Sequence, residues 1–503
     1  MSLKINKRII LTYSIFIVII AYLLYSNSNL EKNNSTNNNT YNGKKAKYVF
    51  YFIGDGMGIP QVNAAEAYLA ANSDIIGIKE LNISHFPAQA LFTTYAENRY
   101  ITGSAAAATA LATGHKTTIN TISMDGSRQR PLKTIAEIAK DNGMKVGIIT
   151  SVSIDHATPA CFYAHQPLRS KYYEIGIDLA NSNFDFFGGG GFKSPAGKNN
   201  KKINSIELAK KNGYKYVNTK EDFNKLNNSS GKVIAVSPIL ANGKALRYAI
   251  DQNKDDITLA DFTSKAIEVL DNEKGFFLMV EGGKIDWACH ANDAATVIHE
   301  VIDFDAAVGK AIDFYKKHPK ETSIVVVGDH ETGGLTIGFA GTKYESSFKL
   351  INNQKVSFEG FNKILSKYKK NHNKSNAKFS DILALLKENF GLGNKNLELS
   401  EYELFRLKEA FNQSINKKNI KPKNIHENTY LLYGGYEPIT VTATHILNQK
   451  AGIAWTTYSH TGTPIPVRVM GVGQNVFKGY FDNTDIPKKM LNIMDIKQKL
   501  SEK

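Results

Sequence analysis

The chain repeats one unit, a helix closed by glycine and followed by a short, continuously apolar strand, and this repetition limits the possible folds more than any other feature. Strands without polar alternation are buried on both faces of a sheet. The sequence therefore predicts an α/β protein, a three-layer sandwich in which a mostly parallel central sheet carries helices on both faces. The helix–strand units lie at 134–150, 206–217, 257–283 and 293–329, with further strands at 48–54 and 467–473.

One region interrupts this rhythm. Residues 340 to about 436 are polar and rich in lysine and asparagine, yet 379–391 and 400–414 carry apolar residues at helical spacing. A connection of this length without a function of its own is unusual in a compact domain. We therefore expect an inserted, mainly helical subdomain at about 340–436 within a catalytic domain that spans 46–503.

The N-terminus has the charge and hydropathy order of an export signal. Lys4, Lys7 and Arg8 precede an apolar run from Ile9 to Tyr25, and a polar, asparagine-rich stretch follows at 26–45. This uncharged, mostly apolar run of 17 residues is at the short limit for crossing a bilayer. The pattern predicts a signal peptide or N-terminal membrane anchor at 1–25, a linker at 26–45, and export to the periplasm or the outside of the cell. Whether the segment is cleaved stays open.

Charge and cysteine content argue against a nucleic-acid-binding protein and against a protein held together by disulfides. The formal net charge is +15, which favours anionic ligands. Much of this charge is lysine in polar segments, and no basic and aromatic motif of a nucleic-acid module is present. Two cysteines, Cys161 and Cys289, cannot form a disulfide framework for 503 residues. The sequence leaves open whether they pair.

Polar residues gather near the ends of the predicted strands, where ligands bind in open α/β sheets. Asp286 and His290 are four residues apart, a spacing that places both on one face of a helical turn and suits a shared metal ion. Carboxylate and imidazole ligands together suit zinc, and oxygen ligands suit magnesium. We therefore expect more than one divalent ion. The polar residues near these strand ends are Asp55, Asp155, His156, Thr158, Glu281, Asp286, His290, Asp329, His330 and His460.

Ser104 stands in the stretch ITGSAAAATALATG, residues 101–114, among small residues. One interpretation is structural, because serine is a good N-cap and alanine the best helix former. The other is functional, because backbone amides and the dipole at a helix N-terminus favour an anion, and a serine there can act as a nucleophile. The stretch alone does not decide between them. A second glycine-rich stretch, FFGGGGF at 186–192, lacks the lysine and serine or threonine of a phosphate-binding loop and is predicted to be a turn.

Six segments together closely resemble the alkaline phosphatase family, in its order and with its internal spacings. They are YFIGDGMG, ITGSAAAATALATG, DHATPACFYAHQPLR, VEGGKIDWACH, VVGDHETGG and YSHTGTP. The resemblance covers roughly 46–340 and 437–475. It implies hydrolysis of small-molecule phosphate monoesters to an alcohol and inorganic phosphate, through a phosphoserine intermediate at a site with two zinc ions and one magnesium ion. It also implies a homodimer.

The resemblance assigns a role to each matching residue. Ser104 resembles the nucleophile, and Arg169 the guanidinium that binds two phosphoryl oxygens. The implied ligands are Asp286, His290 and His460 for the first zinc, Asp55, Asp329 and His330 for the second, and Asp55, Thr158 and Glu281 for magnesium.

Three positions depart from the pattern of some members of the family. Gly103 replaces an aspartate that would help to hold Arg169. His156 occurs where members carry aspartate or histidine, so the third site, which His156 would join, could accept zinc or cobalt. Trp287 replaces a lysine or histidine that contacts phosphate, and no catalytic role is assigned to it.

Two alternatives remain beside the monoesterase. The first is a phosphodiesterase or nucleotide pyrophosphatase on the same scaffold. Such relatives keep the two zinc sites and lack the third-site ligands and the arginine, so Thr158, Glu281 and Arg169 favour monoesters. The second is an exported metal-binding protein without catalytic activity. A missing ligand or nucleophile would favour it, and none is missing.

Overall fold

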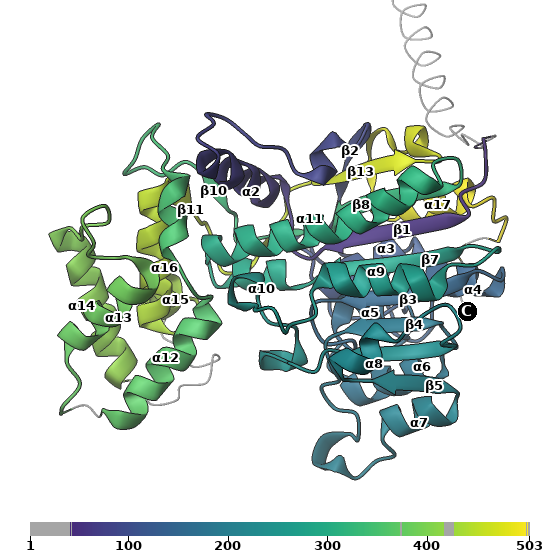
Figure 1. The fold of residues 1–503 in the computed structure, drawn as a ribbon, viewed down its shortest axis with the longest axis horizontal. Coiled ribbons are helices and arrows are strands. Elements are labelled where there is room, and N and C mark those ends of the chain that lie inside the picture. Colours follow the sequence, from purple (N-terminus) through teal and green to yellow (C-terminus); the bar gives the residue numbers. More distant parts are fainter. Residues whose placement is uncertain (1–40, 42, 373–374, 417–426, 499, 501–503) are drawn as a thin grey trace, which may run out of the picture. The chain divides into compact units, whose positions relative to one another are not determined.

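The computed structural model describes residues 41, 43–372, 375–416, 427–498 and 500. The predicted signal or anchor at 1–25 lies outside these residues, as does most of the predicted linker at 26–45. Among the helices of the described residues, none has the length and apolar character needed to span a membrane. The described residues from Gly43 onward belong to one compact unit, which is described below (Figure 1).

A large mixed sheet forms the middle of this unit. In the described part of the chain it has ten strands in the order β14-β2-β13-β8-β1-β7-β3-β4-β6-β5, and β13 alone runs against the others. The mostly parallel sheet confirms the predicted fold class. The strands are β1 Tyr48–Gly54, β2 Ala88–Thr93, β3 Lys145–Thr150, β4 Phe186–Gly189, β5 Tyr214–Val217, β6 Lys232–Val236, β7 Phe276–Gly282, β8 Thr322–Gly328, β13 Ile465–Gly471 and β14 Gly479–Asp482.

Helices cover both faces of the sheet because its central strands are apolar on both sides. On one face, Phe50 and Phe52 of β1 pack edge-on against Phe314 and Phe304 of α11. On the other face, Tyr51 donates a hydrogen bond to the Leu111 carbonyl of α3. Figure 1 shows α9 and α11 in front of the sheet and α3, α4 and α5 behind it. The helices of this layered part are α2 Ile59–Asn72, α3 Ser104–Thr113, α4 Ile135–Asp141, α5 Ala157–Ala160, α6 Tyr172–Asn181, α7 Ser205–Lys211, α8 Lys220–Asn224, α9 Leu259–Leu270, α10 Lys284–His290, α11 Ala294–Lys317 and α17 Asp485–Ile493.

The prediction of a turn over FFGGGGF was wrong for its first half, because Phe186–Gly189 is strand β4. Glycine is needed here for close approach. A Cβ on Gly189 would lie 1.8 Å from the Thr150 carbonyl oxygen of β3, and Gly189 also has φ +125. Composition misleads at this position, because glycine usually marks a turn but also occurs in strands where two backbones approach closely.

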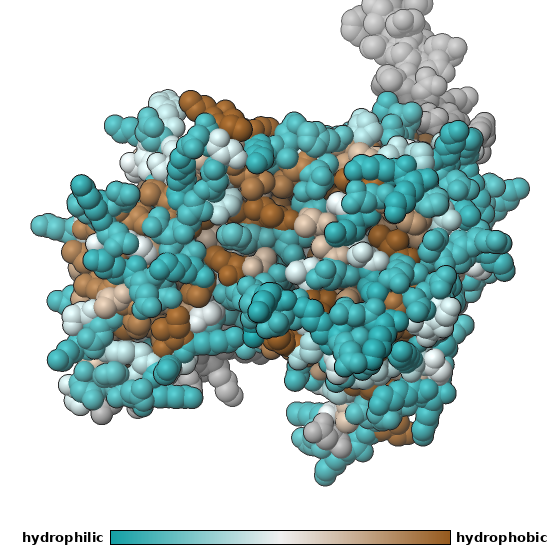
Figure 2. Space-filling view, in the orientation of Figure 1, coloured by the Kyte–Doolittle hydropathy of each residue, from teal (hydrophilic) through white to brown (hydrophobic). Residues whose placement is uncertain are grey.

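Helices α12 Phe358–Asn371, α13 Phe379–Phe390, α14 Glu401–Asn416, α15 Glu427–Tyr433 and α16 Pro438–Ala451 follow the layered part. The helix-like stretches predicted at 379–391 and 400–414 correspond to α13 and α14. Phe361 and Phe390 pack edge-on, and they share an apolar core with Leu447 of α16. This face of the molecule is mainly hydrophilic, with a hydrophobic patch beside α2 (Figure 2). The exposed residues Ile75, Ile76 and Ile78 follow α2 in the chain.

Asp293 connects α11 to the segment that precedes α12. Its carboxylate caps α11 by accepting a bond from the Thr296 amide, 3.1 Å. The same carboxylate accepts bonds from Gln354 Nε2 and from the Phe358 amide, each 2.8 Å. Asp293 is fully buried, so removing it would leave several buried donors without an acceptor.

We expect Asp293→Ala to lower the free energy of unfolding by about 2–4 kcal/mol, through the lost cap and the unpaired donors. The matched control is Asp261→Ala, which alters the exposed N-terminal capping box of α9 and should cost about 1 kcal/mol or less. Urea unfolding followed by circular dichroism gives both values. Equal losses in the two variants would contradict the connecting role of Asp293.

Candidate active site

Three acidic residues lie at one edge of the sheet because of the strand register. Strand β1 lies between β7 and β8, and Gly54 is level with Gly282 and with Gly328. Asp55 and Asp329 directly follow β1 and β8, and Glu281 is the penultimate residue of β7. All three side chains are fully buried. Parallel strands therefore bring together carboxylates that are far apart in the sequence.

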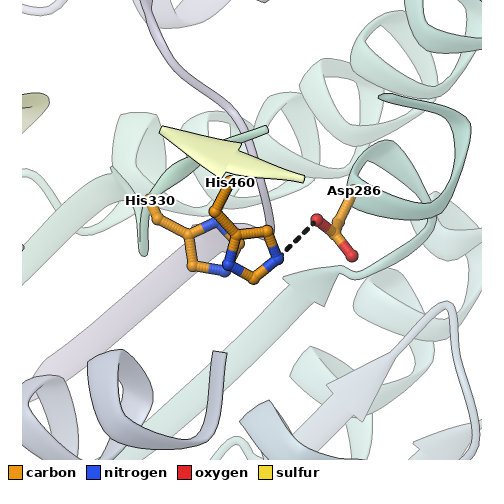
Figure 3. Close-up of side chains that lie close together, drawn as sticks. All are labelled: Asp286, His330 and His460. Carbon is orange, nitrogen blue, oxygen red and sulfur yellow. Dashed lines mark ion pairs between the residues drawn. The ribbon is translucent and has the colours of Figure 1, made fainter. Parts of the chain in front are cut away.

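Two short elements complete the cluster. Helix α10 directly follows β7 and carries Asp286 and His290, whose atoms Oδ1 and Nε2 lie 3.3 Å apart. Strand β12, His460–Thr461, pairs with β9, Glu331–Thr332, and this pairing brings His460 beside His330. The two imidazole rings stack with centroids 3.7 Å apart (Figure 3). His460 Nε2 lies 3.6 Å from Asp286 Oδ1.

The side chains form two overlapping groups with the geometry of metal ligands. In one, ligand atoms of Asp55, Asp329 and His330 lie within 4.8 Å of one another, and in the other the same holds for Asp286, His330 and His460. His290 joins the second group, since its Nε2 lies 3.2 Å from His460 Nε2. The six residues expected to hold two zinc ions are thus together, with His330 between the two sets.

The residues expected at the third site lie beside Asp55. Thr158 Oγ1 lies 3.4 Å from Asp55 Oδ2. Glu281 accepts a bond from Thr150, and its Oε1 has no hydrogen-bond partner among the described residues. His156 is buried, its Nδ1 also lacks such a partner, and its Nε2 lies 3.2 Å from Arg169 Nη2.

Ser104 is the first residue of α3, and Gly103 is the N-cap. The interpretation of Ser104 as an N-cap was therefore wrong. Its hydroxyl is free of that role and lies 3.3 Å from His330 Nε2 and 3.5 Å from Asp55 Oδ1. All ten residues of α3 are buried, so the alanines let this helix enter the interior and direct its N-terminus at the cluster.

Burial and neighbouring charges shift the pKa values of the acids and histidines in this cluster. Burial first, and then Asp329, Asp286 and Glu281, raise the pKa of Asp55 well above its usual range. Burial, opposed by the bond from Thr150, raises the pKa of Glu281 to about 7. Burial lowers the pKa of His290, but Asp286 outweighs it and brings the value to about 9. These shifts show a concentration of negative charge that cations would relieve.

The donor set fits metal ions. Among the unpaired buried atoms are Glu281 Oε1 and His156 Nδ1. Carbonyl oxygens orient two of the histidines: the Tyr458 carbonyl accepts a bond from His290 Nδ1, 2.6 Å, and the Thr102 carbonyl accepts one from His460 Nδ1, 2.8 Å. Both rings therefore present Nε2 as an acceptor, as metal-binding histidines do.

Thr332 is a residue of the site that the sequence did not reveal. Its hydroxyl donates to Asp286 Oδ1, 2.6 Å, and lies 3.2 Å from His330 Nδ1. Because its proton goes to Asp286, its oxygen accepts the His330 proton and leaves Nε2 of that ring as an acceptor. Thr332 lies inside the segment VVGDHETGG, but a threonine that positions two ligands carries no signal of its own. Cys161 and Cys289, whose pairing the sequence left open, are buried free thiols.

Fold and site together define an α/β protein with a buried, metal-binding group of aspartates and histidines around one serine. The sequence profile of the alkaline phosphatase family matches residues 46–496, and the chain belongs to this family.

Its relatives span most of the chain. Alkaline phosphatase 3 of Bacillus subtilis is 32% identical over 473 residues, which cover 92% of each chain. Alkaline phosphatase of Escherichia coli is 32% identical over 339 residues, 57% of this chain and 70% of that one. The crystal structure of a cold-active alkaline phosphatase from Shewanella sp. has a TM-score of 0.72 at 29% identity and covers 89% of this chain and 99% of that one. The chain is thus an enzyme of the alkaline phosphatase family.

We expect the metal-free protein to lose stability as the pH rises from about 4.5 to about 7. The pKa of Glu281 is raised to about 7 by folding, so its contribution is present below the ordinary carboxyl pKa and is lost as the pH rises through the folded value. Glu281→Gln should flatten this part of the profile, whereas the exposed Glu268→Gln should not. Melting temperatures measured in a chelator across this range test the expectation. An unchanged profile in Glu281→Gln would contradict it.

Proposed function

We propose that this enzyme hydrolyses phosphate monoesters through a phosphoserine intermediate on Ser104, at a site that holds two zinc ions and one magnesium ion. The observation that carries the proposal is the place of the Ser104 hydroxyl. It lies within 3.5 Å of both Asp55 and His330, at the N-terminus of a buried helix. A nucleophile placed there reaches a phosphoryl group that is held by the same cluster.

In this proposal Asp286, His290 and His460 hold the first zinc, and Asp329 and His330 hold the second together with Asp55. Asp55, Thr158 and Glu281 hold magnesium. When bound, such ions stabilise negative charge on the attacking and leaving oxygens of a phosphoryl transfer. His156 lies beside the third group, so this site could hold zinc or cobalt instead of magnesium.

The remaining groups bind and orient the phosphoryl group. The first amides of α3 point out of the helix N-terminus and favour an anion. Arg169 carries a planar fork suited to two phosphoryl oxygens. Among the described residues no carboxylate forms an ion pair with Arg169, and its guanidinium lies 3.2 Å from His156 Nε2. At longer range it opposes the rise that burial causes in the pKa values of Asp55 and Glu281, so it lies near the cluster without being held by one acid.

The reaction consists of two displacements at phosphorus. Ser104 Oγ forms a bond to phosphorus while the bond from phosphorus to the ester oxygen breaks, and the alcohol leaves with a proton. Water then attacks the phosphoserine, the Oγ–P bond breaks, and inorganic phosphate leaves. The Ser104 hydroxyl regains its proton. Positioning and charge stabilisation carry the catalysis, as is usual in phosphoryl transfer.

The wider organisation of the chain is part of the same proposal. The apolar run that follows Lys4, Lys7 and Arg8 supports residues 1–25 as a signal peptide or membrane anchor, with a linker at 26–45 and export to the periplasm or beyond. The catalytic domain would span 46–503, with the insertion at about 340–436. Membership of the family supports a homodimer.

We expect the protein, reconstituted with zinc and magnesium, to hydrolyse an aryl phosphate monoester much faster than the matching diester. A chelator should abolish this activity, because charge stabilisation at the cluster is then lost. Release of the aryl alcohol, followed by absorbance, measures both rates. A preference for the diester would contradict the proposal and favour a phosphodiesterase, and turnover of neither ester would favour a metal-binding protein without activity.

Arg169→Ala refines this test. It should lower kcat/KM for the monoester by roughly a hundredfold or more, as removal of one transition-state donor does, and should affect the diester less. Arg130→Ala, which removes an exposed arginine paired with Asp125, is the control and should change neither rate. An equal loss with both esters would argue against a role of Arg169 in recognising the phosphoryl dianion.

A further inference from the structure

The loop after β4 brings a lysine to the edge of the sheet where the site lies. After β4, the Gly191 carbonyl accepts a bond from the Ile154 amide, 3.0 Å, in the loop that follows the neighbouring strand β3. A Cβ on Gly190 would lie 2.2 Å from the Val152 carbonyl oxygen, so only glycine permits this approach. The backbone amide of Lys193 then donates to Asp155 Oδ2, 2.7 Å.

This arrangement explains two features that have no part in the proposed reaction. The glycine run 188–191 and the buried carboxylate of Asp155 both fix the backbone from which Lys193 extends. Asp155 lies at a strand end but is absent from the ligand groups described above. Its contact with the Lys193 amide makes it a structural anchor of the loop.

The ammonium of Lys193 lies over aromatic rings, and the acid that it acts on, Asp155, is buried and bound to the Lys193 backbone amide. Lys193 Nζ lies 4.7 Å from the ring centroid of Tyr172 and 5.9 Å from that of Trp287. It donates one long bond to the Tyr172 hydroxyl, 3.4 Å. Within the described part of the chain no carboxylate forms an ion pair with Lys193. Aromatic faces hold a cation without cancelling its charge.

A short chain of contacts connects this lysine to the candidate active site. The ring of Trp287 packs edge-on against that of His156, with centroids 5.5 Å apart. His156 Nε2 in turn lies 3.2 Å from Arg169 Nη2. Arg169 therefore lies beside His156, and Lys193 lies beside Trp287, which packs on His156.

We propose that Lys193 is a further substrate-binding residue, a second cation that acts with Arg169 to bind the phosphate of the substrate and the inorganic phosphate that is released. The inference rests on the proposed function, because it assumes that the phosphoryl group binds beside Arg169. A partly exposed ammonium near such a site attracts anions and strengthens their binding, and salt weakens both effects.

Lys193→Met tests this in the metal-loaded full-length protein, with inorganic phosphate as the probe. The control is Lys202→Met. That lysine also lies over a tyrosine, 4.2 Å from the ring of Tyr173, but is paired with Glu174 at 3.2 Å. The measurements are made at low and high ionic strength. They give kcat and KM for an aryl phosphate, the inhibition constant of phosphate in that reaction, and the rise in melting temperature that phosphate produces.

We expect Lys193→Met to raise KM and the inhibition constant of phosphate by roughly two- to fivefold at low salt, the size of one partly exposed charge contact, with kcat nearly unchanged. The effect should shrink at high salt. Phosphate should stabilise this variant less than the wild type, and Lys193→Arg should restore the inhibition constant and this stabilisation. Lys202→Met should behave as the wild type.

Equal phosphate affinity in Lys193→Met and the wild type would overturn the inference and leave the proposed function intact. If the wild type hydrolyses no monoester, the proposed function fails. The stabilisation by phosphate still tests Lys193 in that case, because it needs no turnover.

Discussion

The structure depends on one electrostatic constraint, the burial of four carboxylates at a single edge of the sheet. Asp55, Glu281, Asp286 and Asp329 are 5% exposed or less, and ionised groups in that environment are costly unless cations lie beside them. Strand register brings three of these carboxylates together, because β1, β7 and β8 end at the same level, and helix α10 adds Asp286. The histidines, Arg169 and the N-terminus of α3 supply positive charge around the cluster, but the raised pKa of Asp55 shows that they do not balance it.

The candidate ligands are oriented by groups that belong to other elements. The pairing of β9 with β12 brings His460 to His330 across 130 residues of chain. Backbone carbonyls and the Thr332 hydroxyl fix the proton on Nδ1 of each ring. Such outer contacts hold the ligands before any ion arrives, which lowers the cost of ordering them. The ends of the strands therefore carry most of the acids, and groups from other segments fix the orientation of the histidine rings.

Most of the candidate ligands could be predicted from the sequence, because they stand in short motifs in or beside the apolar strands. The spacing of Asp286 and His290 alone indicated a shared metal ion. The stretch around Ser104 left two interpretations open, because a serine before alanines can be a cap or a nucleophile, and the structure places Gly103 at the cap. The strand Phe186–Gly189 was missed because close backbone approach is a tertiary property. The roles of Lys193 and Thr332 could not be predicted for the same reason, because only folding brings these residues to their partners.

The central claim, that the reaction passes through a phosphoserine on Ser104, is tested most directly by trapping the labelled enzyme. Metal-loaded protein is mixed with a phosphate monoester labelled at phosphorus, quenched in acid, digested and analysed by mass spectrometry. The account predicts label on Ser104, absent in Ser104→Ala and absent when a chelator is added first. Label on another residue, or turnover of the monoester by Ser104→Ala at the wild-type rate, would contradict it.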